Sequence, residues 1–277
     1  MISNIQAVVL GLLQGITELF PISSLGHSVL LPSLLGWNID QSSETFVVFL
    51  VFAHLATALV LIGFFWKEWV NIVKGIFRSL AKKRISDDPW AKLGWLIIVG
   101  TIPAGLVGLL FQTKIEALFA SATLVALVLI LNGLLLYTAE IFRKKSETAK
   151  DMTSFTFWKA LKIGCAQCLA LIPGFSRTGS TLGAGLMTGL THEDAAHYSF
   201  LLATPIIFAA GALKLPTLLH ISFTGNAMPI LLGTISSALA AYLSVKFLVK
   251  YFKTKTLTPF AIYCILAGLF SLLVLAR

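Results

Sequence analysis

Six long apolar runs constrain the fold of this chain more than any other feature of its sequence. Each is close to the roughly 20 residues that a helix needs to cross a bilayer. The runs lie at about 45–66, 92–111, 121–142, 194–213, 226–247 and 257–276. Because 57% of the 277 residues are hydrophobic and only 12% are charged, an ordinary soluble domain is excluded. The sequence predicts an all-α, polytopic membrane protein.

Two further apolar stretches are each interrupted by a proline-containing polar loop. The stretches cover 5–20 and 28–36, and then 158–171 and 177–190. Pro21 ends the first helix of the first pair because proline lacks an N–H and clashes with the preceding turn. Non-helical backbone at membrane depth is tolerated where protein or water buries it. We therefore expect two re-entrant helix–loop–helix pairs, each entering and leaving on one face.

The order of these segments indicates an internal duplication within a single membrane domain. A re-entrant pair followed by three spans occurs twice, in halves of about 1–145 and 155–277. Pro21-x-x-Ser24 matches Pro173-x-x-Ser176 in spacing. Because three spans are an odd number, the second half is expected to be inverted relative to the first. The two loops should then meet near the bilayer midplane.

Positive charge favours one orientation. Lys and Arg gather on one predicted side, in or beside the first long loop, before the second re-entrant pair and in the last inner loop: Lys67, Lys74, Arg78, Lys82, Lys83, Arg84, Lys92, Arg143, Lys144, Lys145, Lys150, Lys159, Lys162, Lys246, Lys250, Lys253 and Lys255. Only Lys114, Lys214 and Arg277 fall on the other side. Cytoplasmic loops carry such an excess, so both termini are expected outside the cytoplasm. The net charge of +9 then reflects topology and not a nucleic-acid partner.

Several other reactive side chains are interpreted as structural. Cys165 and Cys168 form a Cys-x-x-Cys pair, which can mark metal or redox chemistry. No second Cys or His pair stands nearby at ligand spacing, and the segment is an apolar helix, so we expect packing. Four histidines lie near span ends or on apolar faces and receive the same interpretation: His54, His192, His197 and His220.

The two interrupted stretches hold the densest polar chemistry of the chain. Glu18 and Arg177 are the ionisable residues left deep in the membrane, where an unpaired charge costs roughly 2.5–3.5 kcal/mol. A simple buried ion pair would explain these two residues. It would leave the surrounding polar side chains without a role: Gln14, Ser23, Ser24, His27, Ser176, Thr178, Ser180 and Thr181.

Each loop also opens a helix, one after Pro21 and one after Pro173. Free N–H groups and the positive end of the helix dipole suit an anion. The fork of Arg177 can hold two phosphate oxygens, and Gly174 allows close approach of the backbone. An acid, an imidazole and several hydroxyls accompany these donors. Together they indicate hydrolysis at a phosphate, with nucleophile, proton carrier and charge stabiliser present.

These motifs resemble the undecaprenyl-diphosphate phosphatase family, the bacitracin-resistance type of integral membrane phosphatase. The resemblance rests on Gln14-x-x-x-Glu18, on Pro21-Ile-Ser23-Ser24-Leu-Gly26-His27 and on Pro173-Gly174-Phe-Ser176-Arg177-Thr178-Gly-Ser180-Thr181. The layout of broken helices and six spans is also similar. Thr178 stands where the family usually has Ser, and Leu25 where many members have Thr. Gln14 stands at a position where many members of the family have Glu, so Glu18 is the one carboxylate of this pair.

The resemblance implies hydrolysis of undecaprenyl diphosphate to undecaprenyl phosphate and inorganic phosphate. That reaction regenerates the lipid carrier of cell-wall synthesis and confers bacitracin resistance. It also implies a lipid-borne substrate, a bacterial cell (inner) membrane location and an active site that opens to the periplasmic or outer side. A homodimer is compatible with this reading.

Residue roles follow as hypotheses. Arg177, with the groups around Ser176 and Thr181, would bind the diphosphate; we extend this role to Gln14, Ser23, Gly174, Thr178 and Ser180. Ser24 is the first choice for nucleophile, with His27 and Glu18 managing its proton. Direct attack by His27 is the alternative. A divalent ion, Mg²⁺ or Ca²⁺, would bind through Glu18 and the phosphates.

Three rival interpretations remain. Inverted repeats with broken helices are typical of transporters, so the same fold could transport or flip a polyprenyl phosphate or another anion. A membrane phosphatase of another family would carry Pro-Ser-Gly-His and Ser-Arg…His signatures, which are missing here as a set. A purely structural membrane protein would not need the polar loops.

Overall fold

The computed structural model describes residues 2–41, 43–85, 88–118, 121–143, 155–214 and 227–276. Throughout these ranges the regular structure is helical, without a strand. Within the described residues, six helices are long and apolar enough to span a membrane: α3 (Glu44–Phe64), α5 (Pro89–Leu110), α7 (Ala122–Ile141), α10 (His192–Leu213), α12 (Ala227–Tyr251) and α13 (Thr258–Leu275). The predicted all-α, multi-pass membrane fold with six spans is confirmed.

The two interrupted stretches form pairs of short helices. The first pair is α1 (Asn4–Thr17) and α2 (Ser24–Leu34). The second is α8 (Phe157–Gln167), continued by a 3₁₀ turn η3 (Cys168–Leu171), and α9 (Arg177–Met187). Each break therefore lies at the predicted proline. Their re-entrant course through the bilayer and the inverted repeat stay predictions.

One helix occupies a segment that the sequence analysis assigned to a loop. Helix α4 (Trp66–Lys82) follows α3 after a single residue and packs along α5. It buries Ile72, Gly75 and Ser79, which lie on one face of a helix. Gly75 allows the close approach, because a Cβ there would lie 2.5 Å from the Ala91 nitrogen. A short helix, α6 (Gln112–Ala117), follows α5.

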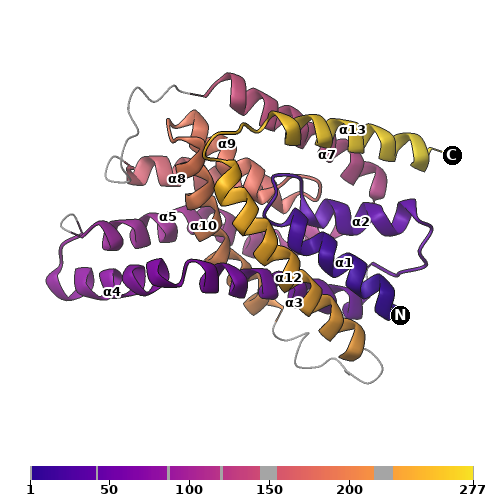
Figure 1. Ribbon diagram of the computed structural model, residues 1–277, viewed down its shortest axis with the longest axis horizontal. Coiled ribbons are helices and arrows are strands. Elements are labelled where there is room, and N and C mark those ends of the chain that lie inside the picture. Colours follow the sequence, from indigo (N-terminus) through magenta and orange to yellow (C-terminus); the bar gives the residue numbers. More distant parts are fainter. Residues whose placement is uncertain are drawn as a thin grey trace.

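The helices pack in pairs around the two interrupted segments (Figure 1). Helix α1 lies against α12, α12 packs on α3, and α7 runs beside α13. Helix α5 contacts α4 on one side and α8 on another, while α9 fits between α7, α8 and α10. The loops that follow α1 and precede α9 are thereby enclosed by longer helices.

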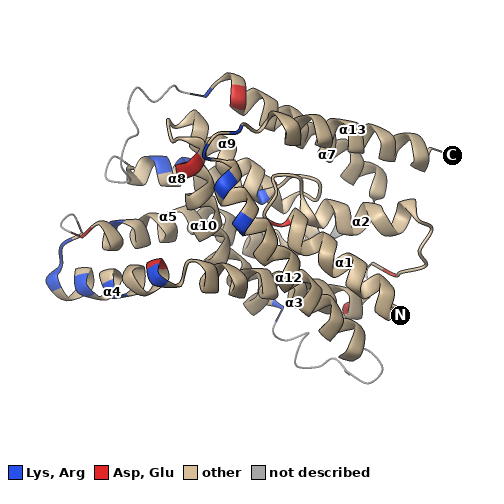
Figure 2. Ribbon diagram, in the orientation of Figure 1, with Lys and Arg blue, Asp and Glu red and all other residues tan. Residues whose placement is uncertain are grey.

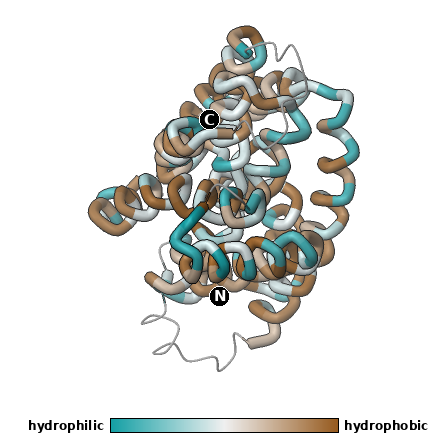
Figure 3. The backbone as a smooth tube through the Cα atoms, turned by 90° about the vertical axis from the view of Figure 1, so that its left-hand side faces the viewer, coloured by the Kyte–Doolittle hydropathy of each residue, from teal (hydrophilic) through white to brown (hydrophobic). Residues whose placement is uncertain are grey.

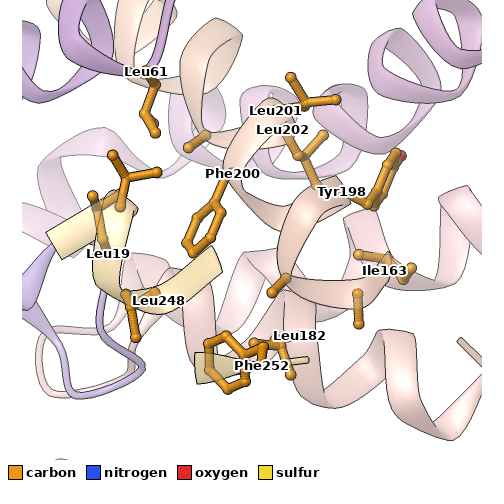
Figure 4. Packing of buried hydrophobic residues seen from close by; sticks show 14 of the residues in the cluster. Leu19, Leu61, Ile163, Leu182, Tyr198, Phe200, Leu201, Leu202, Leu248 and Phe252 are labelled. Carbon is orange, nitrogen blue, oxygen red and sulfur yellow. The ribbon is translucent and has the colours of Figure 1, made fainter. Parts of the chain in front are cut away.

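Buried apolar residues of the described chain form two clusters, and the larger one is built largely around α10. Figure 4 shows Phe200, Leu201 and Leu202 of this helix packed among side chains of other helices, including Leu61 and Leu248. The Tyr198 hydroxyl satisfies its hydrogen-bonding capacity inside the core by donating to the Leu96 carbonyl at 2.7 Å. A buried tyrosine needs such a partner, since an unpaired hydroxyl is costly away from water.

Brown, apolar stretches make up much of the tube in Figure 3, and apolar side chains also lie on the outside of the bundle. Large hydrophobic side chains are exposed on the spanning helices, among them Leu59, Leu106, Leu131, Leu243 and Leu266. A water-soluble protein rarely exposes so much contiguous apolar surface. Contact with lipid chains explains this exterior.

Charge is distributed unequally between the ends of the molecule (Figure 2). Blue segments gather toward the left, where α4 ends and α8 begins, whereas both chain termini lie at the right. The charge asymmetry that the sequence predicted is therefore an asymmetry of the folded chain.

The close contact of α1 with α12 gives a test of the packing. A Cβ at Gly11 would lie 2.2 Å from Ser236 Oγ and 2.3 Å from the Gly233 carbonyl oxygen. We expect Gly11→Ala to lower the free energy of unfolding in detergent by about 1–3 kcal/mol, the usual range for overpacking. Gly63→Ala is the matched control, because no atom lies within 4 Å of a Cβ there. Equal thermal stability of the two variants would contradict the packing.

Candidate active site

The tips of the two helix pairs meet inside the bundle. Glu18 directly follows α1, and Arg177 is the first residue of α9. The Thr178 hydroxyl donates to the Glu18 carbonyl oxygen at 3.0 Å, and Ser176 Oγ donates to the Phe20 carbonyl oxygen at 3.4 Å. Two loops that are far apart in the sequence thus form one polar centre, and their predicted place near the bilayer midplane stays a prediction.

Asn132 on α7 holds the two loops in register. Its Nδ2 donates to the Pro21 carbonyl at 3.1 Å, and its Oδ1 accepts from the Ser176 backbone N–H at 3.0 Å. The side chain is fully buried. A buried amide that satisfies one backbone group of each loop fixes their relative position, since an unpaired backbone group would be costly there.

Glu18 is the hub of the polar centre. Its Oε1 accepts from Arg177 Nη2 at 2.9 Å. Its Oε2 lies 2.5 Å from Ser24 Oγ, 3.2 Å from Gln14 Nε2 and 3.3 Å from His54 Nε2. The carboxylate is therefore surrounded by donors, which compensates its removal from water.

Arg177 is held on two sides and still lines a cavity. Besides its bond to Glu18, its Nη1 donates to the Ser199 carbonyl at 3.4 Å. The side chain is 11% exposed. Because a guanidinium has five N–H donors, Arg177 can keep both partners and still offer hydrogen bonds to an anion in the cavity.

The two helices that begin at the loops are capped by serines. Ser23 Oγ accepts from the Gly26 N–H at 3.2 Å, and Ser176 Oγ accepts from the Gly179 N–H at 3.0 Å. Ser23 has φ 69°, a conformation that L-residues rarely adopt. Such strain persists only where surrounding contacts enforce it, and it concentrates at functional sites. Here it sets the direction of Ser24, the next residue.

A cavity of about 880 Å³ opens from this centre. We call it the central cavity. Its polar lining includes Glu18, Ser24, His54 and Arg177. Beyond them the walls are mostly apolar, with residues from α2, α3 and α10 such as Val29, Phe46, Leu50 and Ile207. It also reaches polar residues at helix ends, namely Asp40, Gln41, Gln112 and Lys214.

His27 does not line the central cavity. Its Nδ1 lies 2.7 Å from the Ser23 carbonyl, and its Nε2 lies 2.8 Å from the Tyr263 hydroxyl on α13. A carbonyl only accepts, so Nδ1 carries a hydrogen, and in the neutral ring the lone pair of Nε2 accepts from Tyr263. Its predicted catalytic role stays a prediction.

The other predicted site residues divide into two groups. Ser23 and Ser176 line the central cavity together with the residues already named. Six other predicted site residues do not line the central cavity: Gln14, His27, Gly174, Thr178, Ser180 and Thr181. Gly174 instead provides a turn with φ 108°, and a Cβ there would lie 2.7 Å from the Val125 carbonyl. Thr181 bonds Ser199 Oγ at 2.6 Å.

Among the lining residues that the sequence did not assign to the site are His54 and Gln167. His54 was interpreted as structural because it lies within a long apolar run, but the packing of α3 against α1 brings it to Glu18. Gln167 is almost fully buried, donates to the Gly100 carbonyl at 3.4 Å and lines the same cavity. The available signal for Gln167 is its spacing, because Gly164-x-x-Gln167 repeats the pattern of Gly11-x-x-Gln14.

The surroundings of Glu18 do not fit a divalent cation held by the protein alone. Mg²⁺ and Ca²⁺ prefer several carboxylate or carbonyl oxygens. Both oxygens of Glu18 already accept from donors, one of them a guanidinium. Within the described ranges, no group of three or more His, Cys, Asp or Glu side chains could hold a metal ion. The prediction of a metal at Glu18 stays a prediction.

Comparisons with known proteins all point to the same family. The family model described as bacitracin resistance protein BacA matches residues 7–270. A protein of Mycolicibacterium paratuberculosis named undecaprenyl-diphosphatase is 45% identical, over 99% of this chain and 98% of its own length. Proteins named undecaprenyl-diphosphatase 2 from Burkholderia ambifaria and Chromobacterium violaceum are 47% and 45% identical, over 96% and 97% of this chain and 94% and 98% of their own lengths.

The bridge at Asn132 gives a test of the site's architecture. We expect Asn132→Ala to leave the Pro21 carbonyl and the Ser176 N–H without this partner, at about 1–3 kcal/mol for each buried group. Hydrogen exchange of the Ser176 amide should accelerate and the protein should unfold at lower temperature. Asn4→Ala, at the exposed start of α1, is the control. Unchanged exchange at Ser176 would contradict the bridge.

Proposed function

The chain belongs to the bacitracin resistance protein BacA family, and from this premise we propose that it hydrolyses undecaprenyl diphosphate to undecaprenyl phosphate and inorganic phosphate. The observation that carries the proposal is the central cavity, where an arginine, a carboxylate and a serine hydroxyl stand at the end of apolar walls. Such a cavity suits a substrate with a diphosphate head and a hydrocarbon tail. The product is the lipid carrier of cell-wall synthesis, and its recycling confers bacitracin resistance.

Phosphate binding falls to Arg177 and to the two helix N-termini. The guanidinium is fixed by Glu18 and by the Ser199 carbonyl, so it is already oriented before substrate arrives. Preorganised donors in a site with little water stabilise the charge that develops during phosphoryl transfer. The N-termini of α2 and α9 add their dipoles at Ser24 and Arg177.

Ser24 is the proposed nucleophile. Its hydroxyl lies 2.5 Å from Glu18 Oε2 and lines the central cavity. This is the arrangement of a weak nucleophile beside the base that accepts its proton. His27 is less suited to direct attack, because Nε2 of the neutral ring accepts from Tyr263 outside the cavity lining. Its bond to the Ser23 carbonyl makes it a positioning residue for the strained turn.

The position of the central cavity supports an outward opening. Its lining reaches Asp40 before α3, Gln112 at the start of α6 and Lys214 after α10. The charge pattern predicts that these helix ends lie on the side opposite the basic loops. We therefore propose a multi-pass protein of the bacterial cell membrane whose active site opens to the periplasmic or outer side. A homodimer stays a prediction.

The test of this function is phosphate release from undecaprenyl diphosphate by the purified protein in detergent. We expect Ser24→Ala and Glu18→Gln to lose at least about 10³-fold in turnover, since they remove the nucleophile or its base. Arg177→Lys should lose about 10²–10³-fold, because lysine cannot reproduce the forked donor.

Ser271→Ala on α13 and Arg78→Lys on α4 are the matched controls, because both residues lie outside the central cavity. Release of phosphate by the wild type, retained in the controls and lost in the site variants, supports the hydrolase. Transport of a polyprenyl phosphate without any phosphate release would replace this proposal with the transporter alternative.

The positioning role of His27 gives a separate test. His27→Ala removes the side-chain bond to the Ser23 carbonyl and keeps the backbone bond to it, and we expect turnover to fall about 10²-fold through displacement of Ser24. His27→Asn keeps a side-chain N–H that can reach the same carbonyl and should recover much of the loss. If His27→Asn is as inactive as His27→Ala and phosphate is trapped on His27, direct attack by the imidazole is correct instead.

The role of Mg²⁺ or Ca²⁺ can be tested with and without substrate. Because Glu18 is occupied by donors, we propose that a divalent ion binds mainly through the substrate phosphates. We expect a chelator to lower hydrolysis, while millimolar Ca²⁺ leaves the melting temperature of the substrate-free protein unchanged. Stabilisation by Ca²⁺ that disappears in Glu18→Gln would instead place the ion on the protein.

A further inference from the structure

The hydrogen bonds of His54 require a proton between this residue and Glu18. Nδ1 lies 2.7 Å from the Leu50 carbonyl on the same helix, and a carbonyl only accepts, so Nδ1 carries a hydrogen. Nε2 lies 3.3 Å from Glu18 Oε2. In a neutral ring this nitrogen would turn its lone pair toward a carboxylate oxygen. The contact is attractive only with a proton between the two atoms, most simply on an imidazolium facing a carboxylate.

The charges around His54 maintain this arrangement. Glu18, after α1, and Arg177, on α9, are the charged groups that act on it. From the other elements packed on α3, the titratable groups are His197 of α10 and Glu68 of α4, whose Nε2 and Oε2 atoms lie 2.8 Å apart. On α12, Ser237 donates to the Ala53 carbonyl beside His54 and carries no charge. One carboxylate therefore lies between two cations.

Glu18 and His54 both line the central cavity beside Ser24. We infer that His54 is a catalytic proton donor and acceptor that works in alternation with Glu18. The inference rests on the proposed function and on Ser24 as its nucleophile. It gives His54, which no motif of the sequence singles out, a role equal to that of Glu18.

In the first half of the reaction the two groups act in opposite senses. The bond from Ser24 Oγ to the terminal phosphorus forms, and the bond from that phosphorus to the bridging oxygen breaks. The hydroxyl proton moves to Glu18 Oε2, 2.5 Å away. The bridging oxygen leaves with the Nε2 proton of His54. Undecaprenyl phosphate departs, and a phosphoserine, a protonated Glu18 and a neutral His54 remain.

In the second half the roles reverse. A water molecule attacks the phosphoserine and gives one proton to Nε2 of His54, which now has a free lone pair. The bond from phosphorus to Ser24 Oγ breaks, and Oγ takes the proton held by Glu18. Inorganic phosphate leaves, and the carboxylate and imidazolium of the starting state are restored. Protons balance over the cycle without any other co-reactant.

The test is His54→Gln, assayed with undecaprenyl diphosphate labelled in its terminal phosphate. Glutamine can donate to Glu18 but can neither release a proton to the leaving group nor accept one from water. We expect turnover to fall about 10²–10⁴-fold, the usual contribution of general acid–base catalysis. Labelled phosphoserine should accumulate at Ser24, because the loss slows the second half more than the first: a phosphate is a good leaving group even without an acid, whereas water is a poor nucleophile without its base. The alkaline limb of the pH–rate profile should disappear, because glutamine has no proton to lose there.

His197→Gln is the matched control, because that histidine lies beside Glu68 and does not line the central cavity. It should keep wild-type turnover and pH dependence. His54→Ala distinguishes loss of the proton carrier from a folding defect. Added imidazole should restore part of its activity by entering the space left by the side chain.

The outcomes separate this inference from the proposed function. Loss of turnover with phosphoserine accumulation and rescue by imidazole supports the alternating pair. Hydrolysis by the wild type together with near-normal turnover of His54→Gln, or a loss without phosphoserine and without rescue, overturns the role of His54 and leaves the hydrolase intact. No phosphate release by the wild type overturns both.

Discussion

The ion pair between Glu18 and Arg177 joins two loops separated by 159 positions in the chain, and the site depends on it. Both side chains are almost fully buried, at 6% and 11% exposure. Removing one partner of such a pair leaves an uncompensated charge, which costs about 3–5 kcal/mol. The pair therefore forces the loops together and orients the carboxylate toward Ser24. The same contact that stabilises the fold prepares the base and the phosphate-binding group.

Support for this pair comes from neutral hydrogen bonds and from strain. Asn132 pairs one backbone group of each loop, so neither loop can shift without exposing an unsatisfied group. Ser23 has φ 69°, and its carbonyl accepts a hydrogen bond from Nδ1 of His27. The other ring nitrogen of His27 is bonded to the Tyr263 hydroxyl. The stored strain resides in the turn that presents Ser24. The central cavity is thus polar where this framework ends and again near Asp40, Gln112 and Lys214, and its walls are mostly apolar elsewhere.

Much of this could be predicted from the sequence, for identifiable physical reasons. Spanning helices follow from apolar length alone, and breaks at Pro21 and Pro173 follow from proline chemistry. A carboxylate and an arginine within apolar segments must find partners, so Glu18 and Arg177 could be paired in advance. The sequence pattern is less informative about the contacts that a polar residue makes within an apolar helix, because helix packing decides them. His54 and Asn132 each lie in a long apolar run, and only the helix–helix contacts show which buried groups they meet. Helix α4 differs from the prediction of a loop, because its basic residues are equally typical of a cytoplasmic loop and of an amphipathic helix.

A structure of the protein with a non-hydrolysable undecaprenyl diphosphonate would test the central claim most directly. The account predicts the terminal phosphonate within hydrogen-bond distance of Arg177 and of Ser24 Oγ, with the hydrocarbon chain along the walls that Phe46 and Leu50 contribute to the central cavity. A diphosphonate bound on the Tyr263 side of His27, away from Arg177, would contradict it. The polar centre would then be a structural ion pair, and the chemistry would lie elsewhere in the fold.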